Sequence, residues 1–461
     1  MARPKKTTAA LPVLNADAAG IDVGADELFV AVPEDRDPQP VRKFGTFTAD
    51  LHAIAGWLKQ CRVRTVALES TGVYWIPLYQ VLEAQGFNVC LVNARHLHSV
   101  PGKTDVADCQ WLQYLHACGL LQASFRPEQA VCAVRSLLRH RDNLIRYASG
   151  HIQQMQKALT QMNLRLHNVI SDITGKTGLA ILDSILAGER DPAALAELRD
   201  SRIKASRETI IKSLEGDYRS EHLFALRQSL SAYRTYQSMI AECDVEIEKM
   251  LSAFDTRPPR GSEESAAGGV AKPAQPAKPA KPEGGNALRF ERTDLAAELY
   301  RLYGTDLTLV PSFGALTVYQ LFSELGRDLS AFQSDKRFCS WLGLCPDNKI
   351  SGGKTLSSRT KRVTSRAARS FRMAAQSLYK SECYLGHYYR RMSAKLGKPG
   401  AITATAHKLA RIYYHLVTTG ESYDEGIFAQ EHERQRNRAE YRLRKQAARL
   451  GLDVVPRSSV T

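Results

Sequence analysis

The sequence predicts a chain that is α/β at its N-terminal end and all-α afterwards. Three observations lead to this fold class. Short apolar strands alternate with amphipathic helices over residues 18–128, and apolar residues recur three and four positions apart over residues 129–255. A segment rich in Pro, Ala and Lys, residues 256–287, then precedes a further helical region. Alternating strands and helices indicate a layered α/β fold, whereas the three-four spacing indicates long helices.

Residues 18–128 divide into strands and helices by period and by turn residues. The glycines at 86 and 119 are typical ends of helices, and Thr104 is a typical helix cap. The predicted elements are two strands joined by a Gly turn (19–32), a third strand (41–48), a helix (49–61), a buried strand (64–70), a helix (75–86), a buried strand (88–94) and a helix (104–119).

The next region carries two apolar series with heptad-like spacing. The first starts at Leu138 and continues through Ile145, Ala148, Ile152, Met155, Leu159, Met162, Leu166 and Val169, and the second contains Leu223, Leu226, Leu230, Tyr233, Ile240, Ile247 and Leu251. Such spacing is typical of a coiled coil or of an antiparallel helical hairpin. Arg141 is the one position that breaks the first series. The length of the series favours a dimer contact over a purely internal bundle.

These patterns predict six segments. They are a basic N-terminal tail (1–17), an α/β domain (18–128), a helical or coiled-coil dimerisation region (129–255), a linker (256–287), a helical domain (288–428) and a basic C-terminal tail (429–461). The linker contains the imperfect repeat AKPAQPAKPAKP and cannot bury enough apolar surface to form a core.

The charge of the chain predicts a polyanionic partner. The formal net charge is +15, and nine Lys or Arg but no acid lie between residues 348 and 381. The tail segment 431–450 adds seven Lys or Arg against three acids. Clustered cations favour nucleic acid, because neutralised phosphates release their counterions.

The cysteines and the apolar runs narrow the class of protein. The nine cysteines form no CxxC pair, which predicts reduced thiols and no zinc site. No apolar run approaches the roughly 20 residues that cross a bilayer, so no membrane is expected. We therefore expect a cytoplasmic protein.

Four carboxylates form a candidate metal site in the α/β region. Asp22 lies in the first strand and Glu69 at the end of a later one, where ligands collect in parallel sheets. Asp105 and Asp108 lie three apart on a helix, so they are neighbours. Four such groups would not all stay ionised unaided, whereas two Mg²⁺ ions about 4 Å apart would neutralise them and hold a phosphate. The helical pair alone is also explained as acids in a first turn.

The third region contains a candidate nucleophile and phosphate contacts. Ser351 precedes Gly352, Gly353 and Lys354, so a backbone without side chains lies beside a cation. A basic phosphate-binding loop with an incidental serine is the alternative. Gly314, in LVPSFGALTVYQLFSELG, is expected at a helix start that grips DNA phosphates. Further candidate backbone contacts are Arg359, Lys361, Arg362, Arg366 and Arg369.

The segments GIDVG, ALESTGVYW and KTDVADCQWL resemble the DEDD tetrad of the transposases of insertion-sequence family 110, most closely its 1111 subgroup. The segment from WLGL to SGGK resembles the second domain of that family. The resemblance implies an RNase H-like (RuvC-like) N-terminal domain in which Asp22, Glu69, Asp105 and Asp108 are metal-binding catalytic residues. It also implies that Ser351 is the nucleophile. Where the family commonly has PGIG, this chain has PSFG at residues 311–314.

The resemblance implies a transposase that recombines DNA through a covalent phosphoserine intermediate. Its implied cofactor is Mg²⁺, as one or two ions, with Mn²⁺ as a substitute. Its implied partners are the element ends and target DNA, a structured guide (bridge) RNA, and further copies of the chain in a dimer or tetramer. One alternative is a structure-selective DNA nuclease, such as a junction resolvase, that uses the acids and water. A second is a nucleic-acid-binding scaffold without catalysis.

Overall fold

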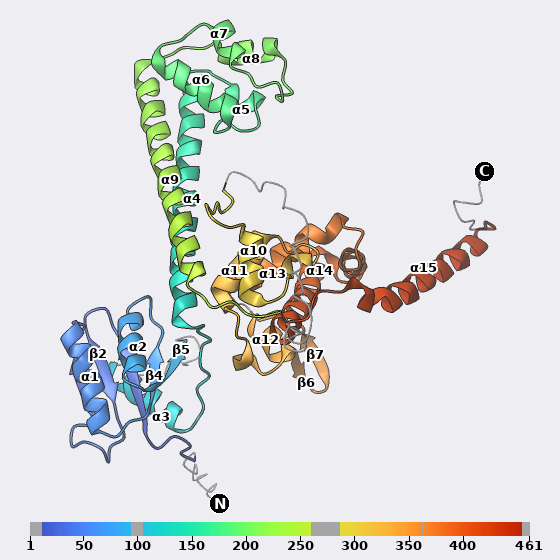
Figure 1. The fold of residues 1–461 in the computed structure, drawn as a ribbon. Helices are drawn as coiled ribbons and strands as arrows, with labels where there is room; N and C mark the ends of the chain where they lie inside the picture. Colours follow the sequence, from blue (N-terminus) through green and yellow to red (C-terminus); the bar gives the residue numbers. More distant parts are fainter. Residues whose placement is uncertain (1–11, 94–104, 260–285, 362, 454–461) are drawn as a thin grey trace, which may run out of the picture. The chain divides into compact units, whose positions relative to one another are not determined.

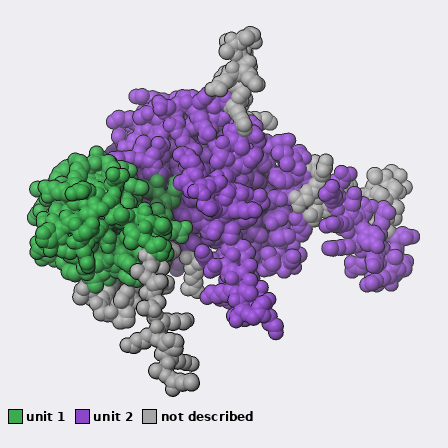
Figure 2. All heavy atoms as spheres, turned by 90° about the horizontal axis from the view of Figure 1, so that it is seen from below, with its two compact units in different colours: residues 1–126 green, residues 127–461 purple. Residues whose placement is uncertain are grey.

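The computed structural model describes residues 12–93, 105–259, 286–361 and 363–453. The chain forms two compact units, Met1–Arg126 and Pro127–Thr461, which Figure 2 colours separately. Each unit has its own arrangement of elements. Among the described residues, no helix is both long and apolar enough to cross a membrane.

The first unit is built around a five-stranded mixed sheet (Figure 1). Its strands are β1 (Ala18–Val23), β2 (Leu28–Ala31), β3 (Val41–Phe44), β4 (Thr65–Glu69) and β5 (Asn88–Val92). Their order is β3-β2-β1-β4-β5. β2 pairs antiparallel with both β1 and β3, whereas β4 runs parallel to both β1 and β5. β1 and β4 are therefore neighbours in the sheet, which brings the strand ends that carry Asp22 and Glu69 together.

Helices cover both faces of this sheet, because the central strands are buried on both sides. Helices α1 (Thr48–Gln60) and α2 (Trp75–Ala84) pack on the face that carries Ile21 and Leu68. Helix α3 (Asp105–Ala117) packs on the other face, where its Leu112 contacts Ala67 and Val92. Successive side chains of a strand alternate between the two faces. This alternation decides which polar side chains of the sheet face α3.

The second unit begins with a long antiparallel hairpin of helices (Figure 1). Helices α4 (Gln129–Gln161) and α9 (Ser220–Ser252) have 33 residues each and pack along one another. Four short helices join them: α5 (Leu166–Val169), α6 (Lys176–Ala187), α7 (Pro192–Glu197) and α8 (Arg207–Leu214). A core around Met155, Leu159 and Leu226 fills the space between these helices. The two predicted apolar series thus meet within one chain.

The interruption of the apolar series at Arg141 is explained by a buried ion pair. Arg141 is 2% exposed and donates to both carboxylate oxygens of Asp244 on α9, at 2.5 and 3.2 Å. It also donates to the backbone carbonyls of Asn286 and Ala287. The guanidinium therefore fixes the chain that follows the linker against the base of the hairpin.

The remaining elements form a mainly helical region. They are α10 (Leu295–Tyr303), η2 (Leu307–Leu309), α11 (Ala315–Leu325), η3 (Ser330–Phe332), α12 (Asp335–Trp341), β6 (Lys349–Ser351), β7 (Lys354–Ser357), α13 (Arg366–Ser377), η4 (Leu378–Lys380), α14 (Tyr384–Thr419), η5 (Glu425–Phe428) and α15 (Ala429–Arg449). Buried aromatic rings of Tyr303, Phe313, Phe371 and Tyr413 contact one another in its core. Glu324 on α11 accepts three hydrogen bonds from Arg139, which joins this region to α4.

Candidate active site

The strands place two of the predicted carboxylates side by side on the α3 face of the sheet. Ile21 of β1 is in register with Leu68 of β4, and one residue further along each parallel strand lie Asp22 and Glu69. Both carboxylates alternate with the residues that face α1 and α2, so they face α3 instead. Both are half-buried.

Helix α3 contributes the other two carboxylates from its first turn. Asp105 is exposed, and Asp108 is half-buried one turn later. The first helical turn leaves unpaired backbone N–H groups, which favour acidic side chains. The predicted cap Thr104 lies outside the described residues.

A close approach of backbones holds α3 on the sheet. At Gly20 an added Cβ would lie 2.3 Å from the backbone nitrogen of Gln113 and 2.4 Å from the backbone carbonyl oxygen of Cys109. The Gln113 amide also donates to the carbonyl of Ala18 at 3.2 Å. A glycine inside a strand often marks such an approach, so GIDVG carried this signal. Gly20 thus positions α3, and with it Asp105 and Asp108, over β1.

The four carboxylates interact electrostatically. The pKa of Asp22 is raised from 3.8 to about 6, and burial of the carboxyl is the largest cause. The negative charges of Glu69, Asp105 and Asp108 raise that pKa further. A backbone hydrogen bond at Val23 acts in the opposite direction. The other three carboxylates thus disfavour the ionised form of Asp22.

The second carboxylate is positioned by its own loop. The Thr71 hydroxyl donates to Glu69 Oε1 at 3.0 Å. Over the described ranges, no three His, Cys, Asp or Glu side chains converge tightly enough to hold a metal ion as they stand. The fold therefore brings the four acids to the same region, but their side chains do not converge into a complete set of metal ligands.

Ser351 lies at the tip of an exposed β-hairpin in the second unit. β6 and β7 pair antiparallel, and Ser351 is opposite Lys354 across a two-residue turn. The turn residues Gly352 and Gly353 have φ values of 55° and 75°. Two left-handed residues in a two-residue loop match a type I′ turn, for which Gly-Gly is a known signal. The sequence prediction missed this hairpin and interpreted the two glycines only as a phosphate approach.

The hairpin tip is open on all sides. An added Cβ at Gly352 or Gly353 would meet nothing within 4 Å, so these glycines serve the turn and do not relieve crowding. Ser351 and Lys354 are both exposed. Within the described chain the Ser351 hydroxyl has no hydrogen-bond partner. The serine is therefore accessible but is not activated by a neighbouring base of its own unit.

The other predicted nucleic-acid contacts occupy different settings. Gly314 is the exposed N-cap of α11. Arg359, Lys361 and Arg369 are also exposed. Arg366 is exposed but forms an ion pair with Asp142 of α4 at 3.3 Å, so its charge is partly neutralised within the chain. The predicted contact Arg362 lies outside the described residues.

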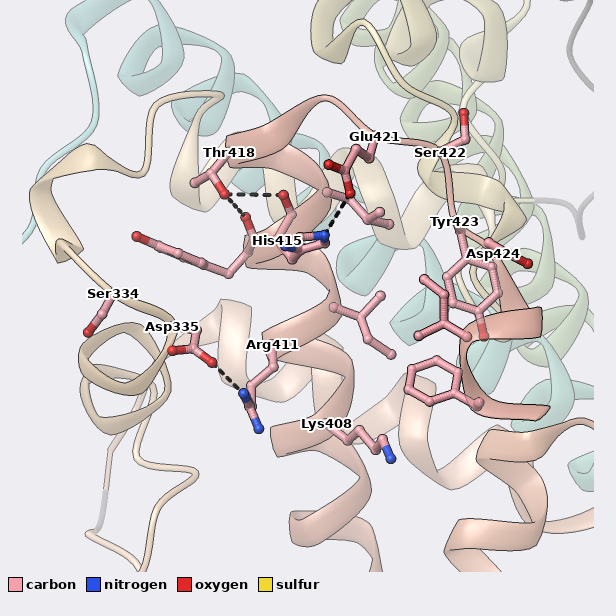
Figure 3. Close-up of a pocket in the computed structure, with 15 residues that line it drawn as sticks. Ser334, Asp335, Lys408, Arg411, His415, Thr418, Glu421, Ser422, Tyr423 and Asp424 are labelled. Atoms are coloured by element: carbon pink, nitrogen blue, oxygen red, sulfur yellow. Dashed lines mark hydrogen bonds and ion pairs between the residues drawn. The ribbon is translucent and has the colours of Figure 1, made fainter. Parts of the chain in front are cut away.

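The second unit contains a cavity of about 590 Å³. It runs along the second half of α14, and two ion pairs line it (Figure 3). Arg411 donates to Asp335 at 2.6 Å, and His415 contacts Glu421 at 2.9 Å. None of the site residues predicted from the sequence lines this cavity.

Comparison with protein families decides the class to which this site belongs. A model of the DEDD transposases of IS110, described as "Transposase", matches residues 19–164. A second model, described as "Transposase IS116/IS110/IS902 family", matches residues 305–390. The chain belongs to the IS110 family of transposases. Together the two matches span half of the chain and include the strands and helix that carry the four acids and the hairpin that carries Ser351.

Membership of the IS110 family makes the chain an enzyme that acts on DNA in transposition. Transposases of the DEDD type generally use divalent metal ions. The mixed five-stranded sheet followed by long helical regions is consistent with an RNase H-like first domain, as expected from the sequence. None of the curated proteins compared with the chain matches it.

Proposed function

We propose that this IS110 transposase excises and integrates its insertion sequence through a covalent link between Ser351 and DNA. The carboxylates of Asp22, Glu69, Asp105 and Asp108 act with the serine on the same scissile phosphodiester. The observation that carries the proposal is the shared environment of the four acids at Asp22. Burial of the carboxyl, and then the negative charges of Glu69, Asp105 and Asp108, raise the pKa of Asp22 to about 6. Acids that only decorated a surface would not share one electrostatic environment.

The hairpin supports Ser351 as the nucleophile. The Oγ of Ser351 attacks a phosphorus of the DNA backbone, and the Oγ–P bond forms as the bond from phosphorus to a deoxyribose oxygen breaks. The serine loses a proton, and the released deoxyribose hydroxyl gains one. Lys354, opposite Ser351 in register, would bind a non-bridging oxygen of that phosphate. The bare backbone of Gly352 and Gly353 lets the phosphate approach.

The four carboxylates fit a divalent cation. All their donor atoms are oxygens, which Mg²⁺ prefers, and their mutual repulsion at Asp22 is what a bound cation relieves. We assign Asp22, Glu69, Asp105 and Asp108 as the residues that would hold one or two Mg²⁺ ions, with Mn²⁺ as a substitute. When bound, such an ion supplies a Lewis acid at the scissile phosphate. The Thr71 hydroxyl orients Glu69 for this role.

Two further parts of the proposal concern partners. We include guidance by a structured bridge RNA encoded with the element, and assembly of the chain into a dimer or tetramer. The exposed cations Arg359, Lys361 and Arg369 support a polyanionic partner but do not distinguish DNA from RNA. Both parts depend on the resemblance to the family.

One observation favours a second candidate function. Because the Ser351 hydroxyl has no partner among the described residues, water could take its place as the attacking group. The protein would then be a metal-dependent, structure-selective DNA nuclease. In that case the hairpin would bind the DNA without forming a covalent bond to it.

A cleavage assay separates the two functions. The full-length protein is incubated with Mg²⁺, the guide RNA and DNA that carries the element ends. Asp105→Asn and Glu69→Gln are expected to lower cleavage by at least roughly 10³-fold, whereas the exposed control Glu27→Gln leaves it unchanged. Ser351→Ala should abolish cleavage, but Ser358→Ala, an exposed serine of the same segment, should not. Cleavage that persists in Ser351→Ala supports the nuclease.

A further inference from the structure

The C-terminal helix α15 carries a one-sided row of cations that no predicted site has used. Each residue advances by about 100° around a helix, so the five cations of the row fall within an arc of about 80°. They are Arg434, Arg438, Arg442, Lys445 and Arg449, here called the basic face. At about 1.5 Å per residue, the basic face extends over about 22 Å.

The basic face is exposed and contains no acid along its length. All five of its side chains are exposed. Between residues 434 and 449 the sequence has one acid, Glu440, which the same spacing places on the opposite side of the helix. There Arg444 pairs with it at 2.7 Å. Tyr441, 67% exposed, borders the basic face.

Such a row is unfavourable for an isolated helix. Like charges four residues apart repel one another, and successive members of the basic face have this spacing or lie three apart. Residues 433–449 of α15 bury almost none of their described side chains, so packing does not offset the repulsion. A row of phosphates would neutralise the charges and stabilise the helix at the same time.

The shape of the basic face selects among polyanions. The major groove of B-form DNA is about 12 Å wide and admits an α-helix between two rows of phosphates. The major groove of A-form RNA is deep and too narrow for side chains to read. A straight helix with cations along one face for about 22 Å therefore fits duplex DNA better than duplex RNA.

We propose that α15 is a duplex-DNA-binding helix that lies in the major groove with its basic face toward the phosphates. This inference extends the proposed transposase function, because it adds a binding site outside the four acids, the Ser351 hairpin and the basic segment 348–381. The contacts are mainly to phosphates and thus independent of base sequence. The helix would hold DNA for the reaction and would take no part in the chemistry.

Charge-neutralising variants of the full-length protein test the proposal. The variant Arg438→Gln/Arg442→Gln/Lys445→Gln removes three charges from the middle of the basic face, and Gln keeps a high helix propensity. The matched control is Lys204→Gln/Lys212→Gln/Arg227→Gln. It removes three exposed cations from the hairpin region of the same unit. Both variants have the same net charge.

The measurement is the dissociation constant for a fluorescent 30-base-pair DNA of random sequence, taken over a series of salt concentrations by anisotropy. Each lost phosphate contact lowers the slope of log K against log salt by about 0.9, so the variant should lose about 2.7 in slope. Its affinity should fall by at least roughly 10-fold at moderate salt, while the control stays close to wild type. A duplex RNA of the same length should lose less affinity than the DNA does.

Two outcomes would overturn the proposal. A variant whose slope and affinity equal those of the control would show that the basic face does not contact DNA. A larger loss with duplex RNA than with duplex DNA would assign α15 to RNA. Because the assay involves no cleavage, either result leaves the serine mechanism standing. Conversely, normal α15-dependent binding without a protein–DNA link would contradict only the proposed function.

Discussion

Replacing Asp22 by Asn is expected to stabilise the protein at neutral pH when metal ions have been removed. The folded protein raises the pKa of Asp22 from 3.8 to about 6, so the folded state holds this proton more tightly than the unfolded state does. Stability is therefore lost as the pH rises from about 4 to about 6, and the full cost is present at pH 7. A shift of about two units corresponds to an upper limit of about 3 kcal/mol, at about 1.4 kcal/mol per unit, and solvent screening at this half-buried carboxyl lowers the gain below that limit.

The assay is urea unfolding with EDTA present, at pH 4 and pH 7.5. Tryptophan fluorescence reports mainly on the first unit, because three of the four tryptophans, Trp57, Trp75 and Trp111, lie in it. Asp22→Asn should gain up to about 3 kcal/mol over wild type at pH 7.5 and almost nothing at pH 4. The control Asp26→Asn, at an exposed position in the turn after β1, should follow wild type at both values.

The same experiment tests the assignment of a metal site. Mg²⁺ added in excess over the EDTA should stabilise the wild-type protein, because a ligand that binds the folded state alone shifts the folding equilibrium. It should have much less effect on Asp22→Asn. An Asp22→Asn protein that is less stable than wild type at pH 7.5 with EDTA would refute the view that the four acids repel one another.

Three further substitutions test the packing. Ser312 has φ = 77° and a buried hydroxyl without a hydrogen-bond partner among the described residues. Ser312→Gly should therefore raise the free energy of unfolding by about 1 kcal/mol. An unchanged urea midpoint would contradict this. Asp244→Ala should lower the free energy of unfolding by about 3–5 kcal/mol, because it leaves the Arg141 guanidinium buried without its carboxylate. The control Asp183→Ala breaks an exposed ion pair and should lower it by less than about 1 kcal/mol. Equal losses of stability in thermal unfolding would argue against the buried pair. Gly20→Ala should displace α3 and lower DNA cleavage by at least about 10²-fold even where the protein stays folded, and full activity in the cleavage assay would show that the approach of α3 is not needed.

The sheet could be predicted because its strands carry strong local signals. GIDVG and VALES are short apolar runs bounded by turn residues, and helices with clear ends separate the later strands. The side-by-side position of Asp22 and Glu69 required one further assumption, that β1 and β4 are neighbours, which the sheet order confirms. The order itself does not follow from local period, since it depends on how the strands pair across the chain.

Other features depend on contacts between residues far apart in the sequence and could not be predicted from local sequence patterns. Arg141 looked like a defect in an apolar series, because its partner Asp244 lies 103 positions away on another helix. The hairpin that carries Ser351 is short and exposed, so it lacks the alternation of a half-buried strand, and only its Gly-Gly turn marked it. The departure from PGIG at Ser312 was visible in the sequence, but its left-handed backbone was not.

The most direct test of the serine mechanism is a search for DNA attached to Ser351. The protein, Mg²⁺, the guide RNA and DNA with the element ends are incubated, denatured and digested with trypsin and a nuclease. Cleavage after Lys349 and Lys354 releases the peptide ISGGK, in which Ser351 is the only hydroxyl-bearing residue. We predict that this peptide carries a nucleotide mass, and that Asp105→Asn abolishes the modification. Cleaved DNA with an unmodified ISGGK peptide would contradict the serine mechanism.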